Sequence, residues 1–454
     1  MKQNRATSKK EISKQHKSLF HCYFYKIIYF IIPTMELFYS LSILIIIATV
    51  FAYINERFMK LPSTIGIMVI TIMFSLALVI IGSINSEPLN DIYELIRNID
   101  FTKLLMGGML YFLLFAGAVQ ININDLKEQK LPIIVFSTLS VIISTFVVGF
   151  ALYYILKFLL PLIGSTMEAP LIYCLLFGAL ISPTDAVAVL SILKKSNVSK
   201  SLETKITGEA LFNDGVAVIL FSLLYSIAQG TEQLVDVTPA SVSWLLIKEV
   251  VGAFIVGLGL GYIALCAIRT VADNKLSILI TLSVVTSGYM ISQAMEISGP
   301  LTMVSAGILI GNRGRRYSEE EHKDFGFVKT FWELIDEIFN AILFLLIGFE
   351  LLIMPDLRNY WIVGTLAILI VLFARYISIK LPIAIIPFHE KFTKSSIFIL
   401  VWGGLRGGVS IALALSIGDN IYRDALIAGT YYVVVFSIIV QGLSIGRVSS
   451  KLKD

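Results

Sequence analysis

Long apolar runs separated by short polar stretches dominate the chain. About 20 apolar residues are needed to span the hydrocarbon core of a bilayer. By that length the pattern predicts an all-α polytopic membrane protein with about thirteen transmembrane helices. The predicted spans are 37–54, 62–84, 102–120, 131–156, 170–193, 206–229, 242–268, 276–293, 297–312, 332–353, 360–381, 396–418 and 424–446.

Composition supports this class and narrows the functions. The chain has 454 residues, of which 57% are hydrophobic and 15% charged, whereas soluble domains carry about 25% charge. The sequence has no Gly-rich phosphate-binding loop ending in Lys-Ser/Thr, so direct ATP drive is not expected. The chain is predicted to be a transporter rather than an enzyme. No cofactor and no nucleic-acid partner is expected either. The histidines lie outside the deep spans, which leaves carboxylates as candidate proton carriers.

Loop charges predict the orientation in the cell (inner) membrane. With the C-terminus in the cytoplasm, most Lys and Arg lie inside, including the clusters at 194–205 and 313–329, as the positive-inside rule requires. The basic segment 1–35 conflicts with this topology. Either Met35 is the working start, or residues 19–32 form an interfacial segment. The transmembrane domain is then 36–446, followed by a short cytoplasmic tail at 447–454.

Three acids lie deep in predicted spans. The segment Gly208-Glu-Ala-Leu-Phe-Asn-Asp-Gly215 places Glu209 and Asp214 in the sixth span, and Asp185 lies in the fifth. An ionised carboxylate near the bilayer centre costs about 2.5–3.5 kcal/mol on insertion scales. Intramembrane acids therefore indicate an ion or proton path.

The fifth span is predicted to be a broken helix. Pro183 lacks an N–H and disfavours helical angles at Ser182. We expect Ser182 to cap a second half-helix, with Pro183 first and Asp185 third in it. The break would leave the carbonyls of 179–181 able to coordinate a cation. Asp185 then either caps or contacts the ion directly.

Helical spacing separates the polar residues of the sixth span. Asp214, Ala210 and Thr207 share one face, and Glu209 and Asn213 share the next. We expect Asp214 to point at an ion, and Glu209 and Asn213 to bond to neighbours. A buried acid held only by a salt bridge is the alternative, and it suits Glu209 better than Asp214.

A counter-charge lies in the twelfth span. Trp402-Gly-Gly-Leu-Arg-Gly-Gly408 holds Arg406 among glycines that weaken the helix, namely Gly403, Gly404, Gly407 and Gly408. We expect a Glu209–Arg406 ion pair. Close helix packing is the other interpretation of the glycines.

The two interrupted spans occupy matching places. Each is the second member of a trio, spans 4–6 and 11–13, and the trios are an odd number of spans apart. Inverted repeats with two discontinuous helices, expected to cross, are the strongest sequence indication of a transporter binding site.

At the start of the tenth span, Glu333, Asp336, Glu337 and Asn340 share one face. This face is interpreted as a solvated helix entry, with a cation-attracting vestibule as the alternative.

The signature segments resemble the cation:proton antiporter superfamily, most closely its NhaP-type Na+/H+ antiporters. The resemblance rests on Ser182-Pro-Thr-Asp-Ala-Val-Ala-Val189, on the segments 208–215 and 402–409, and on 331–336 and 440–443. It implies a thirteen-helix fold, a homodimer, a mobile core (131–229 and 360–446) and a scaffold that carries the dimer contacts (36–120 and 242–353).

The resemblance also implies roles for residues. Asp214 takes the Na+ or H+, and Thr184 and Asp185 line the Na+ site at the helix crossing. An Asn-Asp pair, here Asn213-Asp214, goes with electroneutral exchange in the family. Ala210 departs from the family pattern, which often has Ser at this position and thereby a further cation ligand.

The predicted function is secondary active transport in pH homeostasis. Cytoplasmic Na+ (or Li+) is exchanged for external H+ by alternating access, with 1:1 electroneutral stoichiometry. K+/H+ exchange by the same fold is the first alternative. A cation channel is the second, but it would need a continuous pore with selectivity rings.

Overall fold

The computed structural model describes most of the chain. The described residues are 41–82, 101–162, 170–185, 189, 198–230, 239–271, 273–321, 325–353 and 357–451. The predicted N-terminal extension at 1–35 lies outside them, as do residues 452–454 of the predicted tail.

Every regular element in the described part is helical. Nine helical stretches in that part are long and apolar enough to cross a bilayer, the first being Leu41–Met59. The all-α multi-pass fold is therefore confirmed, while the number of thirteen crossings stays a prediction. The helices are α2 (Ser63–Gly82), α4 (Phe101–Leu104), α5 (Leu110–Gln120), α6 (Ile123–Glu128), α7 (Lys130–Ser137), α8 (Leu139–Leu162), α9 (Leu171–Ile181), α11 (Lys200–Ala228), α12 (Pro239–Thr270), α13 (Asn274–Met295), α14 (Gly299–Glu321), α15 (Gly326–Ile353), α16 (Trp361–Ile385), α17 (Lys394–Trp402), α18 (Gly408–Leu415), α19 (Arg423–Phe436) and α20 (Gly442–Lys451).

Short segments of different pitch join some of these helices. Three are π-helical: η1 (Asn55–Met59), η2 (Leu105–Met109) and η4 (Ser437–Gln441). The fourth, η3 (Leu357–Tyr360), is a single 3₁₀ turn. π-helical turns widen a helix and leave backbone groups available to neighbours, and they occur often at functional sites.

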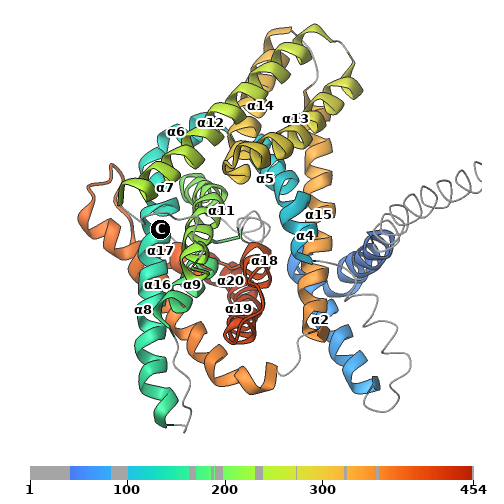
Figure 1. Ribbon diagram of the computed structural model, residues 1–454. Coiled ribbons are helices and arrows are strands. Elements are labelled where there is room, and N and C mark those ends of the chain that lie inside the picture. Colours follow the sequence, from blue (N-terminus) through green and yellow to red (C-terminus); the bar gives the residue numbers. More distant parts are fainter. Residues whose placement is uncertain are drawn as a thin grey trace, which may run out of the picture.

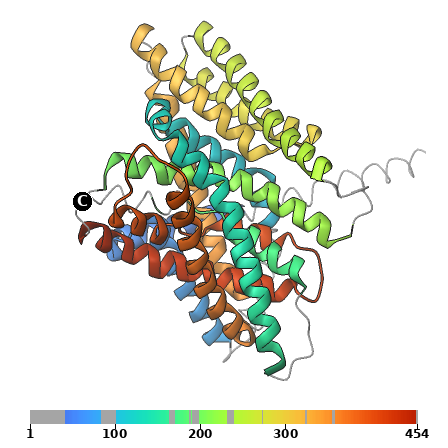
Figure 2. The same cartoon turned by 90° about the vertical axis from the view of Figure 1, so that its left-hand side faces the viewer.

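The helices pack in two groups. In the first, α12 and α5 pack on α14, α13 packs on α12, and α15 packs on α2 and α5. In the second, α8 packs on α9 and α16, α11 on α7 and α9, and α19 on α16 and α18. Figures 1 and 2 show α12–α14 gathered at one end of the molecule, away from α8, α16 and α19.

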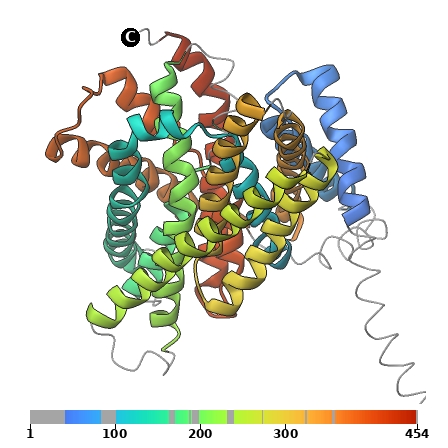
Figure 3. The same ribbon diagram turned by 90° about the horizontal axis from the view of Figure 1, so that it is seen from above.

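α11 lies where the two groups meet. It contacts α7 and α9 on one side and α14 and α5 on the other, and Figure 3 shows it (green) between α8 and α14. The short helix α18 also bridges the groups, since it contacts α9 and α19 as well as α4 and α15. The predicted site residues therefore lie at the boundary between the groups.

Side chains of α14 bind the backbone between α5 and α6, where the chain passes from the first group to the second. The Asn312 amide nitrogen on α14 donates to the carbonyl of Ile121 (2.9 Å), and its oxygen accepts from the Ile123 N–H (2.8 Å). Arg315 Nη2 also donates to the Ile121 carbonyl (2.5 Å). These bonds satisfy backbone groups that the end of α5 and the start of α6 leave open. They hold the beginning of α6 against the first group.

Candidate cation-binding site

The first helix break lies at the predicted proline, but its cap differs from the prediction. α9 ends at Ile181, and residues 182–185 are not helical. Ser182 is the C-terminal cap of α9, and its hydroxyl donates to the carbonyl of Gly178 (2.6 Å). The prediction that Ser182, Pro183 and Asp185 begin a second half-helix is therefore wrong. The serine bonds backward to the helix before it.

The second break falls among the predicted glycines. α17 ends at Trp402 and α18 begins at Gly408, so five non-helical residues separate two short helices. The Gln441 amide of η4 donates to the carbonyl of Trp402 (3.0 Å), and the Ser437 hydroxyl of η4 accepts from the Arg406 N–H (3.0 Å). The π-helical turn thus satisfies backbone groups that the break exposes.

The two breaks cross and touch. The Asp185 N–H donates to the carbonyl of Leu405 (2.7 Å). Gly407, the N-terminal cap of α18, lies directly against the Asp185 side chain, because a Cβ at this glycine would stand 2.1 Å from Asp185 Oδ2. The carboxylate thereby lies at the N-terminal end of α18.

Arg406 binds the backbone of the first break. Its guanidinium is buried, and one nitrogen, Nη1, donates to the carbonyls of Ser182 (2.5 Å) and Pro183 (2.9 Å). Carbonyls were expected to be available to a cation at 179–181. The structure instead shows an arginine satisfying the carbonyls of the break itself.

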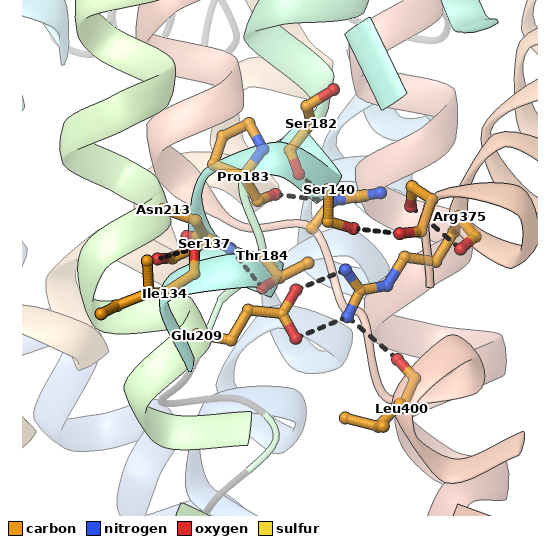
Figure 4. Close-up of polar contacts among 12 residues, drawn as sticks. Ile134, Ser137, Ser140, Ser182, Pro183, Thr184, Glu209, Asn213, Arg375 and Leu400 are labelled. Carbon is orange, nitrogen blue, oxygen red and sulfur yellow. Dashed lines mark hydrogen bonds and ion pairs between the residues drawn. The ribbon is translucent and has the colours of Figure 1, made fainter. Parts of the chain in front are cut away.

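The predicted Glu209–Arg406 ion pair is wrong. Glu209 is buried on α11, and both of its oxygens accept from Arg375 of α16, with Arg375 Nη2 at 3.0 Å from Oε2 and Nη1 on Oε1. Arg375 Nη2 also donates to the carbonyl of Leu400 (3.0 Å). Figure 4 shows the two guanidinium nitrogens facing the two carboxylate oxygens. This planar, two-point geometry suits a buried arginine–carboxylate pair.

The neighbour of Asp214 contacts the first break. Asn213 is fully buried, and its amide nitrogen donates to the Thr184 hydroxyl (2.8 Å). Figure 4 shows this bond between α11 and the non-helical stretch. Asn213 and Glu209 thus bond to neighbouring elements, whereas Asp214 faces elsewhere.

Asp214 faces a cavity of about 570 Å³. Thr184, Asp185, Ala210 and Thr207 line the same cavity. The structure thus brings together the three residues assigned to the ion, Asp214, Asp185 and Thr184, at the crossing of the broken helices.

Acidic side chains of α15 and α6 also line the cavity. Glu333, Asp336, Glu337 and Asn340 of α15 line it. Asp125 of α6 lines it too and forms an ion pair with Lys200 of α11 (2.8 Å). Acids along the walls of a cavity raise the local concentration of cations. Lys200 and Lys329 line the same cavity, and Glu333 and Glu337 are exposed. The geometry therefore agrees with both interpretations of the α15 acids, a vestibule and a solvated helix entry.

Sequence reasoning missed Arg375 and Ser437. Arg375 lies in the predicted span 360–381, about two-thirds of the way along. A buried basic residue in a transmembrane helix is costly and needs a partner, so this arginine was a detectable signal. Ser437 gave no comparable signal, because small polar residues are common in transmembrane helices.

Comparisons with known proteins agree with this architecture. The family model described as "Sodium/hydrogen exchanger, transmembrane" matches residues 6–451. The Na(+)/H(+) antiporter NhaP of Pseudomonas aeruginosa is 41% identical over 412 residues, covering 88% of this chain and 94% of that protein. The Na(+)/H(+) antiporter NhaH of Halobacillus dabanensis is 31% identical, covering 78% and 84% of the two chains.

The solved structure of the sodium proton antiporter MjNhaP1 from Methanocaldococcus jannaschii at pH 8 shares the fold. It superposes with a TM-score of 0.70 at 18% identity and covers 92% of this chain and 99% of that one. The broken-helix crossing, the match over nearly the whole chain and the 41% identical relative lead to one assignment. The chain belongs to the sodium/hydrogen exchanger family of multi-pass membrane transporters.

Proposed function

We propose that the protein exchanges cytoplasmic Na+ (or Li+) for external H+ across the cell membrane. The observation that carries the proposal is the meeting of Asp214, Asp185 and Thr184 in one cavity beside two broken helices. Relatives named as Na(+)/H(+) antiporters support the choice of ions.

Asp214 is the shared carrier in this proposal. A proton or a bound Na+ neutralises its carboxylate, and either form crosses the membrane barrier at low cost. The empty, ionised form carries an uncompensated charge and crosses poorly. Exchange follows because only the two loaded states are allowed to move the site between the two sides.

The surrounding residues have distinct roles. Asp185 and Thr184 complete the Na+ site, and Asn213 holds Thr184 in place through its amide. Glu209 with Arg375 ties α11 to α16, and Arg406 ties the second break to the first. These contacts keep the second group of helices together as it moves.

Alternating access moves one group of helices against the other. The mobile core comprises residues 131–229 and 360–446, and the scaffold comprises 36–120 and 242–353. Lys200 near the start of α11 and Lys329 near the start of α15 line the cavity, and both belong to the basic clusters of the sequence. With those clusters in the cytoplasm, this cavity is assigned to the inward-facing side in this proposal.

The scaffold is also proposed to form a homodimer interface. α12 carries large apolar side chains that are exposed in the monomer, including Trp244, Ile255 and Tyr262. A second copy or lipid acyl chains would cover them.

The test is proton flux in proteoliposomes with Na+, Li+ and K+ added in turn. We expect saturable proton movement with Na+ and Li+, and near-complete loss in Asp214→Asn, which keeps the side-chain size but cannot titrate. Substantial Na+-driven exchange in purified Asp214→Asn would overturn the carrier assignment. If K+ alone drives proton flux, the substrate cation is K+ rather than Na+. A cation current without proton movement would indicate a channel.

A further inference from the structure

We propose that Ser410 of α18 supplies a neutral oxygen ligand to the cation held by Asp214, and thereby sets the affinity for Na+. This inference rests on the proposed function and adds a residue to the same site. It starts from a hydroxyl group without a partner. Ser410 is 1% exposed, and its Oγ has no hydrogen-bond partner among the described residues.

A buried hydroxyl without a partner is unusual, because nearly all buried polar groups in folded proteins are hydrogen-bonded. Ser410 lines the cavity that contains Asp214 and Thr184. A cation in this cavity would give the hydroxyl oxygen a partner. Hard cations such as Na+ bind carboxylate, carbonyl and hydroxyl oxygens.

The position of Ser410 in α18 brings it to the crossing. It is the third residue of this helix, one turn after the cap residue Gly407, which lies against Asp185 Oδ2. The first turn of α18 therefore lies beside the carboxylate of Asp185 and on the wall of the cavity. Ser410 joins the site from the second broken helix, whereas Thr184 joins it from the first.

α11 leaves room for such a ligand. On the face of Asp214, Ala210 has no oxygen, and the Thr207 hydroxyl donates to the carbonyl of Glu203 (2.8 Å). The Asp214 carboxylate is therefore the one charged ligand on this face, and the lone pairs of the Thr207 hydroxyl are the other side-chain oxygen source. A hydroxyl from α18 would compensate for the one that Ala210 lacks.

One other partnerless hydroxyl lines the cavity. Thr64 is 6% exposed, and its Oγ1 also has no partner among the described residues. It stands at the start of α2, which packs mainly on α15 and also contacts η1 and η4; α2 itself contains neither break. Thr64 is therefore a matched control, a buried hydroxyl on the same cavity but on the other group of helices.

The experiment compares wild type, Ser410→Ala, the double variant Ala210→Ser/Ser410→Ala and Thr64→Val in proteoliposomes. Loss of a ligand to a charged group should raise the half-saturating Na+ concentration of Ser410→Ala on the order of tenfold, with the maximal rate unchanged. The double variant should regain much of the affinity, because it returns a hydroxyl to the face of Asp214. Thr64→Val should behave as wild type.

A binding readout separates a ligand from a structural role. Na+ should raise the thermal midpoint of the purified wild type through binding to the folded state, and the same rise in Ser410→Ala should need on the order of ten times more Na+. An unchanged Na+ dependence in both assays would overturn the proposal. So would a lower maximal rate at unchanged half-saturation without rescue by Ala210→Ser.

Parallel measurements on Asp214→Asn keep this test distinct from that of the proposed function. If wild type moves no protons in response to Na+, the proposed function fails. If wild type is active, Asp214→Asn is inactive and Ser410→Ala equals wild type, only the role of Ser410 fails.

Discussion

Arg375 of α16 binds both carboxylate oxygens of Glu209 of α11, although the two residues are 166 positions apart in the chain. The pair is buried, with side-chain exposures of 7% for the arginine and 1% for the glutamate. It joins a helix of each predicted repeat unit, because α11 belongs to the first trio of spans and α16 to the second. The pair therefore acts as a tie within the proposed mobile core.

The first prediction concerns this pair. Glu209→Gln and Arg375→Gln should each lower the free energy of unfolding by about 3–5 kcal/mol, by analogy with buried pairs in soluble proteins, because each leaves a buried group without its partner. The double variant should lose less than the sum of the two. The measurement is a thermal-denaturation cycle in detergent. Additive losses would show that the two residues are not coupled.

Arg406 provides the control for that cycle. Arg406 bonds to the carbonyls of Ser182 and Pro183 rather than to Glu209. The losses in unfolding free energy of Glu209→Gln and Arg406→Gln should therefore be closer to additive in the double variant than those of the Glu209 and Arg375 variants. A strong coupling between Glu209 and Arg406 would instead restore the pairing expected from the sequence.

The second prediction concerns the contact between the breaks. Gly407→Ala places a methyl group where Asp185 Oδ2 stands, so the carboxylate or the start of α18 must move. We expect Na+/H+ exchange to fall to a small fraction of wild type while membrane insertion is retained. The assay is Na+-driven proton flux in proteoliposomes.

Gly259→Ala is the matched glycine control. A Cβ at this position on α12 meets nothing within 4 Å. The substitution should leave exchange intact and should stabilise the helix by roughly 0.5–1 kcal/mol. Wild-type exchange in Gly407→Ala would show that the crossing tolerates displacement of Asp185.

The third prediction concerns stoichiometry. Of the three acids at the crossing, Asp214 is the one left to alternate between ions, because Glu209 is paired with Arg375 and Asp185 lies against the N-terminal cap of α18. The neighbouring Asn213 cannot titrate. Exchange should then be 1:1 and independent of voltage. The check is Na+-driven proton flux under an imposed membrane potential. A rate that shifts with voltage would show that a second carboxylate, with Asp185 the first candidate, takes part.

The fourth prediction concerns pH and the loop between α16 and α17. Glu390 accepts hydrogen bonds from Lys205 (2.5 Å), Gln129 (3.1 Å) and Ser201 (3.0 Å). These bonds, led by that from Lys205, lower the pKa of the Glu390 carboxyl below its ordinary value. The ionised form is the one stabilised by folding. Its contribution is therefore present above the ordinary glutamate pKa of about 4.3 and is lost as the pH falls through the lowered value.

Glu390→Gln should accordingly lower the thermal midpoint at neutral pH by a modest amount, since the carboxylate is half-exposed. The difference from wild type should shrink as the pH falls below about 4. Glu56→Gln, at an exposed acid of η1, should show no such trend. A difference that stays constant with pH would mean that the charge of Glu390 does not stabilise the loop.

Much of the membrane fold could be predicted from local sequence. The length of a span can be read from the sequence. The proline after Ser182 and the glycines around Arg406 change the backbone of the residues beside them. For that reason the two helix breaks lie at Ser182–Pro183 and among the glycines of 403–407, where the sequence indicates weak helix, although the cap at Ser182 differs from the prediction. The cost of burying Asp214 and Asp185 depends on their depth in a span, which the sequence also gives.

The partners of buried charges depended on tertiary structure. Two arginines in the spans, Arg375 and Arg406, were possible partners of Glu209. Which of them pairs with Glu209 depends on the rotation and depth at which α11 packs against α16 and the second break. Sequence spacing fixes which side chains share a face of one helix, but not which helix that face meets. A salt bridge between residues 166 positions apart is settled only when the helices pack, because a shift of one residue turns a helical side chain by about 100°.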